Sequence, residues 1–245
     1  MGNSSGRFDI NTTIGVPDAL TGERRKQMMA LSEKARKTMP PAFKNEAQEG
    51  PVESEEGDRA VEIGAAAVAR SYRVGGGGLL GLFSSSGYPP RRQLEEELGG
   101  LEGFFTLFGC HYCRMFADPR MRVLFDSRHA DTNVSALEHG KRVGASLLDR
   151  WYGTRLFRQL GRGSAFFAVT PTHQRAKSCP MRPRGHRRAQ RFTTTQRNAW
   201  IGHVCCAAEE VGASEDFRTR LGDWLAANIA VYAPWLDEET GQLVD

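Results

Sequence analysis

The chain has 245 residues, of which 40% are hydrophobic, 9% aromatic and 25% charged. This composition is that of an ordinary globular protein, and it excludes a fully disordered chain, a collagen and a coiled-coil rod. No apolar run reaches about eighteen residues, so we expect no transmembrane helix. The formal net charge of +4 is too small to require a nucleic-acid partner by itself.

The five cysteines are an odd number for a secreted scaffold held together by disulfides. Cys205 and Cys206 are adjacent and cannot easily pair with each other. With no apolar signal core at the N-terminus, this predicts a reducing, cytoplasmic location. The segment from Met1 to Gly6 only partly resembles a myristoylation start, because its sixth residue is glycine rather than Ser or Thr.

Residues 1–92 are rich in Gly, Ser, Pro and charge and have little apolar periodicity. Runs such as Gly75–Gly78 and Ser84–Ser86 are typical of linkers. We expect short helices over residues 23–37 and 61–70 and otherwise a flexible, low-complexity extension.

Helical periodicity begins near Arg92. Apolar residues from Leu101 to Phe116 recur at spacings of three and four, and Asp118-Pro119 ends this predicted helix. We find no convincing strand-like alternation in the rest of the chain. We therefore expect an all-α domain over residues 93–236, followed by a short tail over residues 237–245.

Three further helices are predicted over residues 134–152, 195–211 and 215–231. Asn133 or Thr132 is the expected N-cap of the first of them, and Gly153 follows its end. The expected inward-facing positions are Ala136, Gly140, Val143 and Leu147 in the first helix, Trp200, Val204, Ala208 and Val211 in the second, and Phe217, Leu221, Trp224, Leu225 and Ile229 in the third.

Residues 154–198 hold eleven basic residues and no acidic one, whereas the other residues hold 22 basic and 29 acidic. Such a stretch can bind RNA, membrane phosphates or the carboxylates of a cofactor, or it can be a solvated loop. The net charge of the whole chain hides this concentration.

Three polar aromatic or imidazole side chains lie on or beside apolar helix faces, namely Tyr112, His139 and Trp200. Such side chains need a partner or a cavity, and the simplest interpretation is that they are satisfied core residues. His186 lies in a basic segment before the helix that carries Trp200. A neutral imidazole is a good iron ligand, although a surface histidine in a basic loop fits the same pattern.

Two motifs are weaker than they look. Cys110 and Cys113 have C-x-x-C spacing, but no second ligand pair accompanies them, which argues against zinc. Arg114 follows, so this is not the covalent haem attachment motif, and no strand precedes it as in a thioredoxin-type redox motif. Gly75–Gly78 lacks the Gly-Lys-Ser/Thr of a phosphate-binding loop.

An ordered set of motifs over about residues 93–236 resembles the truncated haemoglobins, most closely the group with a tryptophan in the distal pocket. Leu98-Gly99-Gly100 with Tyr112 is similar to the opening of that family and the tyrosine of its second helix. The set continues with Asp118-Pro119 and the aromatic Phe125, His139 with Val143, Trp151-Tyr152-Gly153, the run Met181–His186, and Arg197-Asn198-Ala199-Trp200-Ile201.

The resemblance implies a two-over-two helical sandwich around haem b, with His186 as the proximal iron ligand and His173 as the alternative. It implies Phe108, Phe125, Val143, Leu147 and Arg184 as further haem-binding residues. Tyr112, Trp200 and His139 would face a diatomic gas, O2 with NO and CO as further ligands. The implied roles are oxygen binding, transport, storage, sensing or detoxification of O2 and NO, with a reductase as a possible partner.

Two other functions stay open. The first is a helical binding module without a cofactor, which would use residues 154–198 to engage acidic partners or RNA. The second is NO dioxygenation or peroxide chemistry by the same haem, which needs the same pocket as reversible binding. The sequence also leaves open whether His139 binds the iron itself, and the oligomeric state.

Overall fold

The computed structural model describes residues 22–40, 54–75, 89–122, 134–160 and 192–244, and these residues are mostly helical. The predictions for His186, Arg184, Phe125 and His173 concern residues outside these ranges. In chain order the helices are α1 (Gly22–Lys37), α2 (Glu55–Gly75), α3 (Arg91–Leu98), α4 (Leu101–Ala117), α5 (Pro119–Arg122), α6 (Ala136–Tyr152), α7 (Leu156–Leu160), α9 (Thr194–Glu210) and α10 (Glu215–Ile229), followed by the 3-10 turn Ala230–Tyr232. The expectation of an all-α domain is confirmed.

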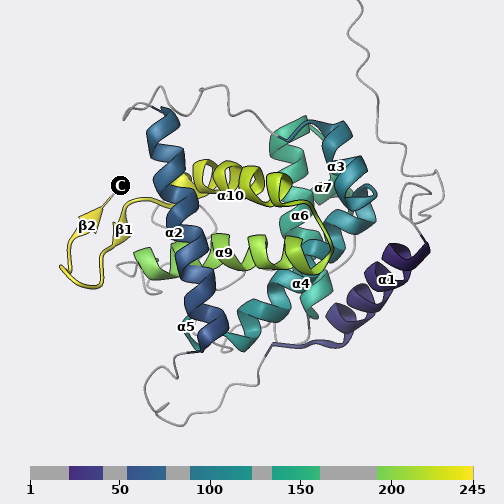
Figure 1. The fold of residues 1–245 in the computed structure, drawn as a ribbon, viewed down its shortest axis with the longest axis horizontal. Helices are drawn as coiled ribbons and strands as arrows, with labels where there is room; N and C mark the ends of the chain where they lie inside the picture. Colours follow the sequence, from purple (N-terminus) through teal and green to yellow (C-terminus); the bar gives the residue numbers. More distant parts are fainter. Residues whose placement is uncertain (1–21, 41–53, 76–88, 123–133, 161–191, 245) are drawn as a thin grey trace, which may run out of the picture.

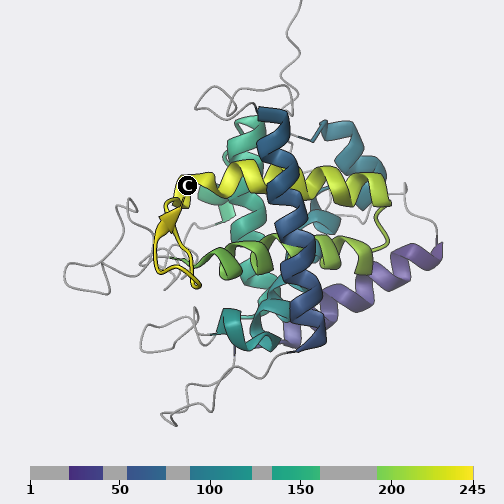
Figure 2. The same cartoon turned by 60° about the vertical axis from the view of Figure 1, so that its left-hand side comes forward.

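Helix α9 lies at the centre of the molecule. It packs against α4 on one side, against α2 on another and against α10, while α4 also packs against α6. Figures 1 and 2 show α2 crossing over both α9 and α10. Because α9 is enclosed on several sides, every residue from Ile201 to Ala208 is buried. A helix of this kind has apolar residues all round rather than on one stripe.

Helix α2 approaches α9 so closely that only small residues fit between them. A Cβ atom on Gly202 would overlap the carbonyl oxygen of Ala60, and a Cβ on Gly64 would overlap that of Asn198. These neighbours are backbone atoms, which cannot rotate away as a side chain could. This crossing therefore depends on glycine at both positions.

The N-terminal region differs from the flexible extension expected for residues 1–92. Helix α1 is close to its predicted range, but α2 is twice as long as predicted and contributes Ala67 and Val68 to a second hydrophobic cluster of buried residues. Its contact face is built of alanine and glycine, which carry little hydrophobicity in a composition count. Charge pairs reinforce both helices: Lys34 in α1 reaches Glu210 at 3.3 Å, and Arg59 in α2 reaches Glu209 at 2.8 Å.

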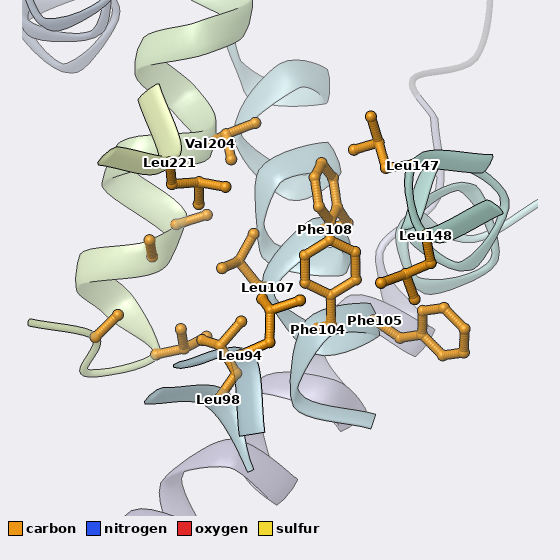
Figure 3. Packing of buried hydrophobic residues seen from close by; sticks show 14 of the residues in the cluster. Leu94, Leu98, Phe104, Phe105, Leu107, Phe108, Leu147, Leu148, Val204 and Leu221 are labelled. Carbon is orange, nitrogen blue, oxygen red and sulfur yellow. The ribbon is translucent and has the colours of Figure 1, made fainter. Parts of the chain in front are cut away.

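The main apolar core lies between α4, α6 and α10, with α3 closing one end. Figure 3 shows Phe104 and Phe108 of α4 on the side of Leu147 and Leu148, and Leu107 on the side of Leu221. Phe104 and Phe108 meet edge to face, with ring centroids 5.0 Å apart. The predicted inward positions of α10 are all buried. The apolar periodicity therefore located this core correctly.

Helix caps explain where the later helices begin. The N-cap of α6 is Ser135, whose hydroxyl accepts from the Glu138 backbone N–H, so the expected cap at Asn133 or Thr132 is wrong by two or three residues. Thr193 and Gln196 form a reciprocal capping box at the start of α9. Gly153 follows α6 as predicted, with a left-handed φ of 64°.

The C-terminal residues form a short β-hairpin where no strand was expected. Strand β1 (Trp235–Leu236) pairs antiparallel with β2 (Leu243–Val244), and the Trp235 side chain is buried. A two-residue strand is too short to show an alternation of apolar and polar residues, so the sequence could not predict this hairpin. Among the described helices, none is both long and apolar enough to cross a bilayer.

Candidate functional site

Three of the predicted ligand-facing residues lie on three different helices and meet in one place. Tyr112 of α4 stacks on His139 of α6, with ring centroids 4.9 Å apart and planes inclined by 24°. Trp200 of α9 lies on the other side of His111, which also contacts Tyr112. Both of these contacts have centroid distances of 5.2 Å. We call Tyr112, His139, His111 and Trp200 the ring cluster.

The close approach of α4 and α6 positions His139 against Tyr112. Gly140 faces the backbone of Phe108 and Gly109 so tightly that a Cβ atom would overlap the Gly109 nitrogen. His139 directly precedes Gly140, so its imidazole reaches the Tyr112 ring across this crossing. Phe116, one turn after Tyr112, adds an edge contact to His139 at 5.7 Å.

Burial keeps the imidazoles of this cluster neutral. Desolvation is the largest cause that lowers the pKa of His139, to about 3, and Arg142 adds to the effect. His111 is fully buried, and desolvation again is the largest cause of a pKa far below its usual value, with contributions from His203 and Arg114. At physiological pH both rings are therefore uncharged, each with one N–H donor and one lone pair.

Three of the predicted haem-binding residues are apolar and lie in the described helices, Phe108 in α4 and Val143 and Leu147 in α6. Phe108 is fully buried and its ring contacts His111 at 5.9 Å. Val143, one turn after His139, is half-buried. It packs against the main apolar core and against a second cluster of buried residues that includes Tyr112 and Ala67. Leu147, one turn further, is buried. Of these three side chains, Phe108 is in direct contact with the ring cluster.

Two functional candidates were not foreseen from the sequence, namely His111 and the pair formed by His203 and Asp118. His203 Nε2 lies 2.8 Å from Asp118 Oδ2, and both side chains are almost completely buried. Burial raises the pKa of Asp118, but hydrogen bonds from His203 and Arg120 outweigh it and hold that pKa below its usual value. Asp118 was interpreted only as a helix-ending residue, because its bond to a histidine 85 positions away leaves no local pattern in the sequence.

The four cysteines in the described part of the chain show no sign of special reactivity. Cys110, Cys113, Cys205 and Cys206 are free thiols. Burial raises the pKa of Cys110 and of Cys205 to about 12. Such thiols are protonated and poorly nucleophilic. In the part of the chain that the structure describes, no three His, Cys, Asp or Glu side chains are grouped as metal ligands.

The basic stretch over residues 154–198 lies largely outside the described ranges. Of its described members, Arg155 is exposed, and Arg197 places its guanidinium 5.5 Å from the ring centre of Trp235. Desolvation is the main cause that lowers the pKa of Arg197. Arg197 therefore holds the C-terminal hairpin against α9 rather than facing solvent freely.

Comparisons with known proteins return no match for this chain. None of the protein-family models matches it, and no curated protein and no solved structure is similar enough to count as a match.

Proposed function

We propose that this chain is a haem-binding protein of the globin type that binds a diatomic gas, O2 with NO and CO as further ligands, beside the ring cluster. The proposal includes the two-over-two arrangement, with α4 and α6 as one helix pair and α9 and α10 as the other. Both pairs have direct contacts, and α4 also contacts α9.

One observation carries the proposal. The sequence motifs of the resemblance assign ligand-facing roles to Tyr112, His139 and Trp200, which lie far apart in the chain. Tyr112 and His139 are in direct ring contact, with centroids 4.9 Å apart, and Trp200 is joined to Tyr112 through the ring of His111, which lies 5.2 Å from each of them.

The described residues fit the distal half of a haem site. A flat apolar macrocycle needs a dry wall, which Phe108 of α4 and Val143 and Leu147 of α6 would supply. A bound gas needs hydrogen-bond donors in a medium of low dielectric, where such bonds are strong. Buried, neutral imidazole and phenol groups are suitable donors, and a charged group at this depth would be costly.

The chain's own residues then have distinct tasks. His186, with His173 as the alternative, would hold the iron from the proximal side, and Arg184 and Phe125 would contact the macrocycle. Haem, when bound, supplies reversible binding of the gas. The Tyr112 hydroxyl and the Trp200 indole N–H would donate to the gas, and each such bond is worth about 1–3 kcal/mol. His139 would orient Tyr112 by stacking on its ring and would add a third donor.

Absorption spectra of the full-length protein produced with a haem supply test the proposal. The expected result is a Soret band and a five-coordinate ferrous spectrum that His186→Ala abolishes. His173→Ala is the matched control and should leave the spectrum unchanged. The reverse result for the two variants would move the proximal role to His173, and a colourless protein would favour the cofactor-free binding module.

A further inference from the structure

Helix α1 differs in charge from the other helices that the structure describes. Its 16 residues include six basic and two acidic side chains, an excess of four positive charges. In each of the other described helices of eight or more residues, the numbers of basic and acidic residues differ by at most one. Among the described helices, positive charge is therefore concentrated on α1.

One side of α1 holds this helix on the rest of the molecule. Its buried residues are Met28 and Ala35, and the helix packs against α4 and α6. Arg24 donates to a backbone carbonyl of α3, and Lys34 donates to the Glu210 carboxylate at the end of α9, at 3.3 Å. Two of the six basic side chains therefore fix α1 in place.

The other side of α1 is an exposed basic face. It carries Met29 among four basic residues, and we call this set the α1 outer face: Arg25, Lys26, Met29, Arg36 and Lys37. The side chains of Lys26 and Lys37 are 79% and 75% exposed, and Met29 is 57% exposed. Figures 1 and 2 show α1 at the edge of the molecule. The described part of the chain therefore leaves this face open.

Two glutamates of the same helix offset this charge only in part. Lys26 lies 3.8 Å from Glu23, while Glu33 lies 3.1 Å from Arg36 and 3.2 Å from Lys37. Exposed ion pairs of this kind contribute little stability because water and salt screen them, so these cations can exchange one anionic partner for another. With both glutamates counted, this side of α1 keeps an excess of two positive charges.

The exposed methionine indicates which kind of anionic partner fits. A long apolar side chain among cations can enter between lipid headgroups, while the apolar stems of lysine and arginine lie along the boundary. Single-stranded nucleic acid is usually bound with aromatic side chains that stack on the bases, and α1 contains no aromatic residue. The face is therefore better suited to a lipid surface than to nucleic acid.

We propose that the α1 outer face docks this protein reversibly on a membrane surface that contains anionic lipid. The helix lies parallel to the membrane plane, and lipid phosphates and carboxylates take the place of Glu23 and Glu33 beside the basic side chains. Met29 enters the headgroup boundary. Clusters of four to eight Lys and Arg residues on an amphipathic helix are typical of such binding, which needs no membrane-spanning segment. The inference does not depend on haem.

Sedimentation of the full-length protein with lipid vesicles tests the proposal. We expect binding to vesicles of phosphatidylcholine mixed with phosphatidylserine, little binding to phosphatidylcholine alone, and loss of binding as salt is added. Replacing both Lys26→Glu and Lys37→Glu should weaken binding by at least about tenfold. Met29→Ser leaves the charge unchanged and should weaken binding by a smaller factor.

Two control variants separate the position of the charge from its amount. Lys26→Arg combined with Lys37→Arg keeps the charge at the same positions and should retain binding. Arg59→Glu combined with Arg220→Glu changes the net charge as much as the double glutamate variant of α1, but at exposed positions of α2 and α10, and should have little effect. Unchanged binding in the α1 glutamate variant, or an equal loss in the α2 and α10 variant, would overturn the proposal.

A measurement on the wild type keeps the test valid if a variant fails to fold. Spin-labelled lipid in the phosphatidylserine vesicles should broaden the NMR signals of Lys26 and Met29 more than those of the buried Met28 and Ala35. Broadening confined to other parts of the chain would contradict the proposal. Tighter binding of the wild type to a uridine oligonucleotide than to these vesicles would assign the face to nucleic acid instead.

Discussion

Two faces of helix α9 show two different ways to fill a protein interior. Against α2, the face consists of glycine and alanine, and the backbones touch. Against α4, the face carries Trp200 and His203, and the partners are His111 and Asp118. The first face is stabilised by close backbone contact, and its glycine and alanine residues carry no polar or titratable side chain. The second leaves ring nitrogens of His111 and His203 without a hydrogen-bond partner among the described residues, a cost that is tolerated where the groups serve a function.

The small-residue face should be the most sensitive to substitution. Gly202→Ala places a methyl group on the carbonyl oxygen of Ala60, so α2 must move away from α9. We expect a loss of about 3 kcal/mol or more in the free energy of unfolding, measured by denaturant titration. Gly22→Ala is the matched control, because nothing lies within 4 Å of its added Cβ.

A loss in Gly202→Ala no larger than that in Gly22→Ala would mean that α2 is not held at this crossing. Combining Gly202→Ala with Gly64→Ala sharpens the test. Both substitutions separate the same pair of helices, so the double variant should lose less stability than the two single losses added together.

The ring cluster should instead make the free energy of unfolding depend on pH. The folded-state pKa of His139 is about 3, well below the usual 6.5. Between these two pH values His139 is protonated in the unfolded chain and neutral in the folded chain, which favours unfolding. The stability is intact above pH 6.5 and falls as the pH drops through the window between 6.5 and 3. At pH 5 the protonation of this one residue in the unfolded chain lowers the free energy of unfolding by about 2 kcal/mol.

Unfolding titrations of the wild type and of His139→Phe between pH 7 and pH 4.5 measure this effect. Phenylalanine keeps a ring against Tyr112 but does not titrate, so the variant should lose less stability on acidification. Parallel pH curves for the two proteins would show that His139 is not held neutral. His111 should contribute in the same direction, because its pKa is also lowered by burial.

Ligand release should report on the ring cluster itself. We expect Tyr112→Phe to speed O2 dissociation several-fold in the ferrous protein, because the variant loses one hydrogen-bond donor near the gas. Tyr152→Phe is the control, since the Tyr152 hydroxyl donates to the backbone of Pro89, outside the ring cluster. An unchanged rate in stopped-flow measurements of Tyr112→Phe would exclude Tyr112 from contact with the ligand.

The charge pairs at the C-terminal end of α9 should matter least. Lys34 bonds to Glu210 at 3.3 Å, but its side chain is mostly exposed. We expect Lys34→Ala to cost under about 1 kcal/mol in the free energy of unfolding. A loss as large as that of Gly202→Ala would mean that surface charge, rather than close backbone contact, fixes the N-terminal helices.

The sequence predicted the features that depend on apolar periodicity. Phe104 and Phe108 in α4 and Leu221 in α10 occupy the core as expected, because large side chains at spacings of three and four leave a clear pattern. The apolar periodicity did not predict the role of α2. Ala60 and Gly64 contribute because their small size lets α2 and α9 approach closely, and not because they are hydrophobic.

The candidate site was predicted only in part for a different reason. Tyr112, His139 and Trp200 could be assigned because family motifs single them out. His111 and His203 carry no motif, and the contacts of His111 with Trp200 and of His203 with Asp118 depend on how α4 and α9 face each other, which is a tertiary property. The Asp118–His203 bond joins residues 85 positions apart and leaves no local pattern.

A hemin titration of the purified wild-type protein tests the central claim most directly. The account predicts a Soret band that rises with added hemin and saturates at a fixed ratio of hemin to protein. The Tyr112 and His139 ring signals should shift over the same range. Contradiction would be a protein that stays colourless after gel filtration, with the NMR signals of the ring cluster unmoved.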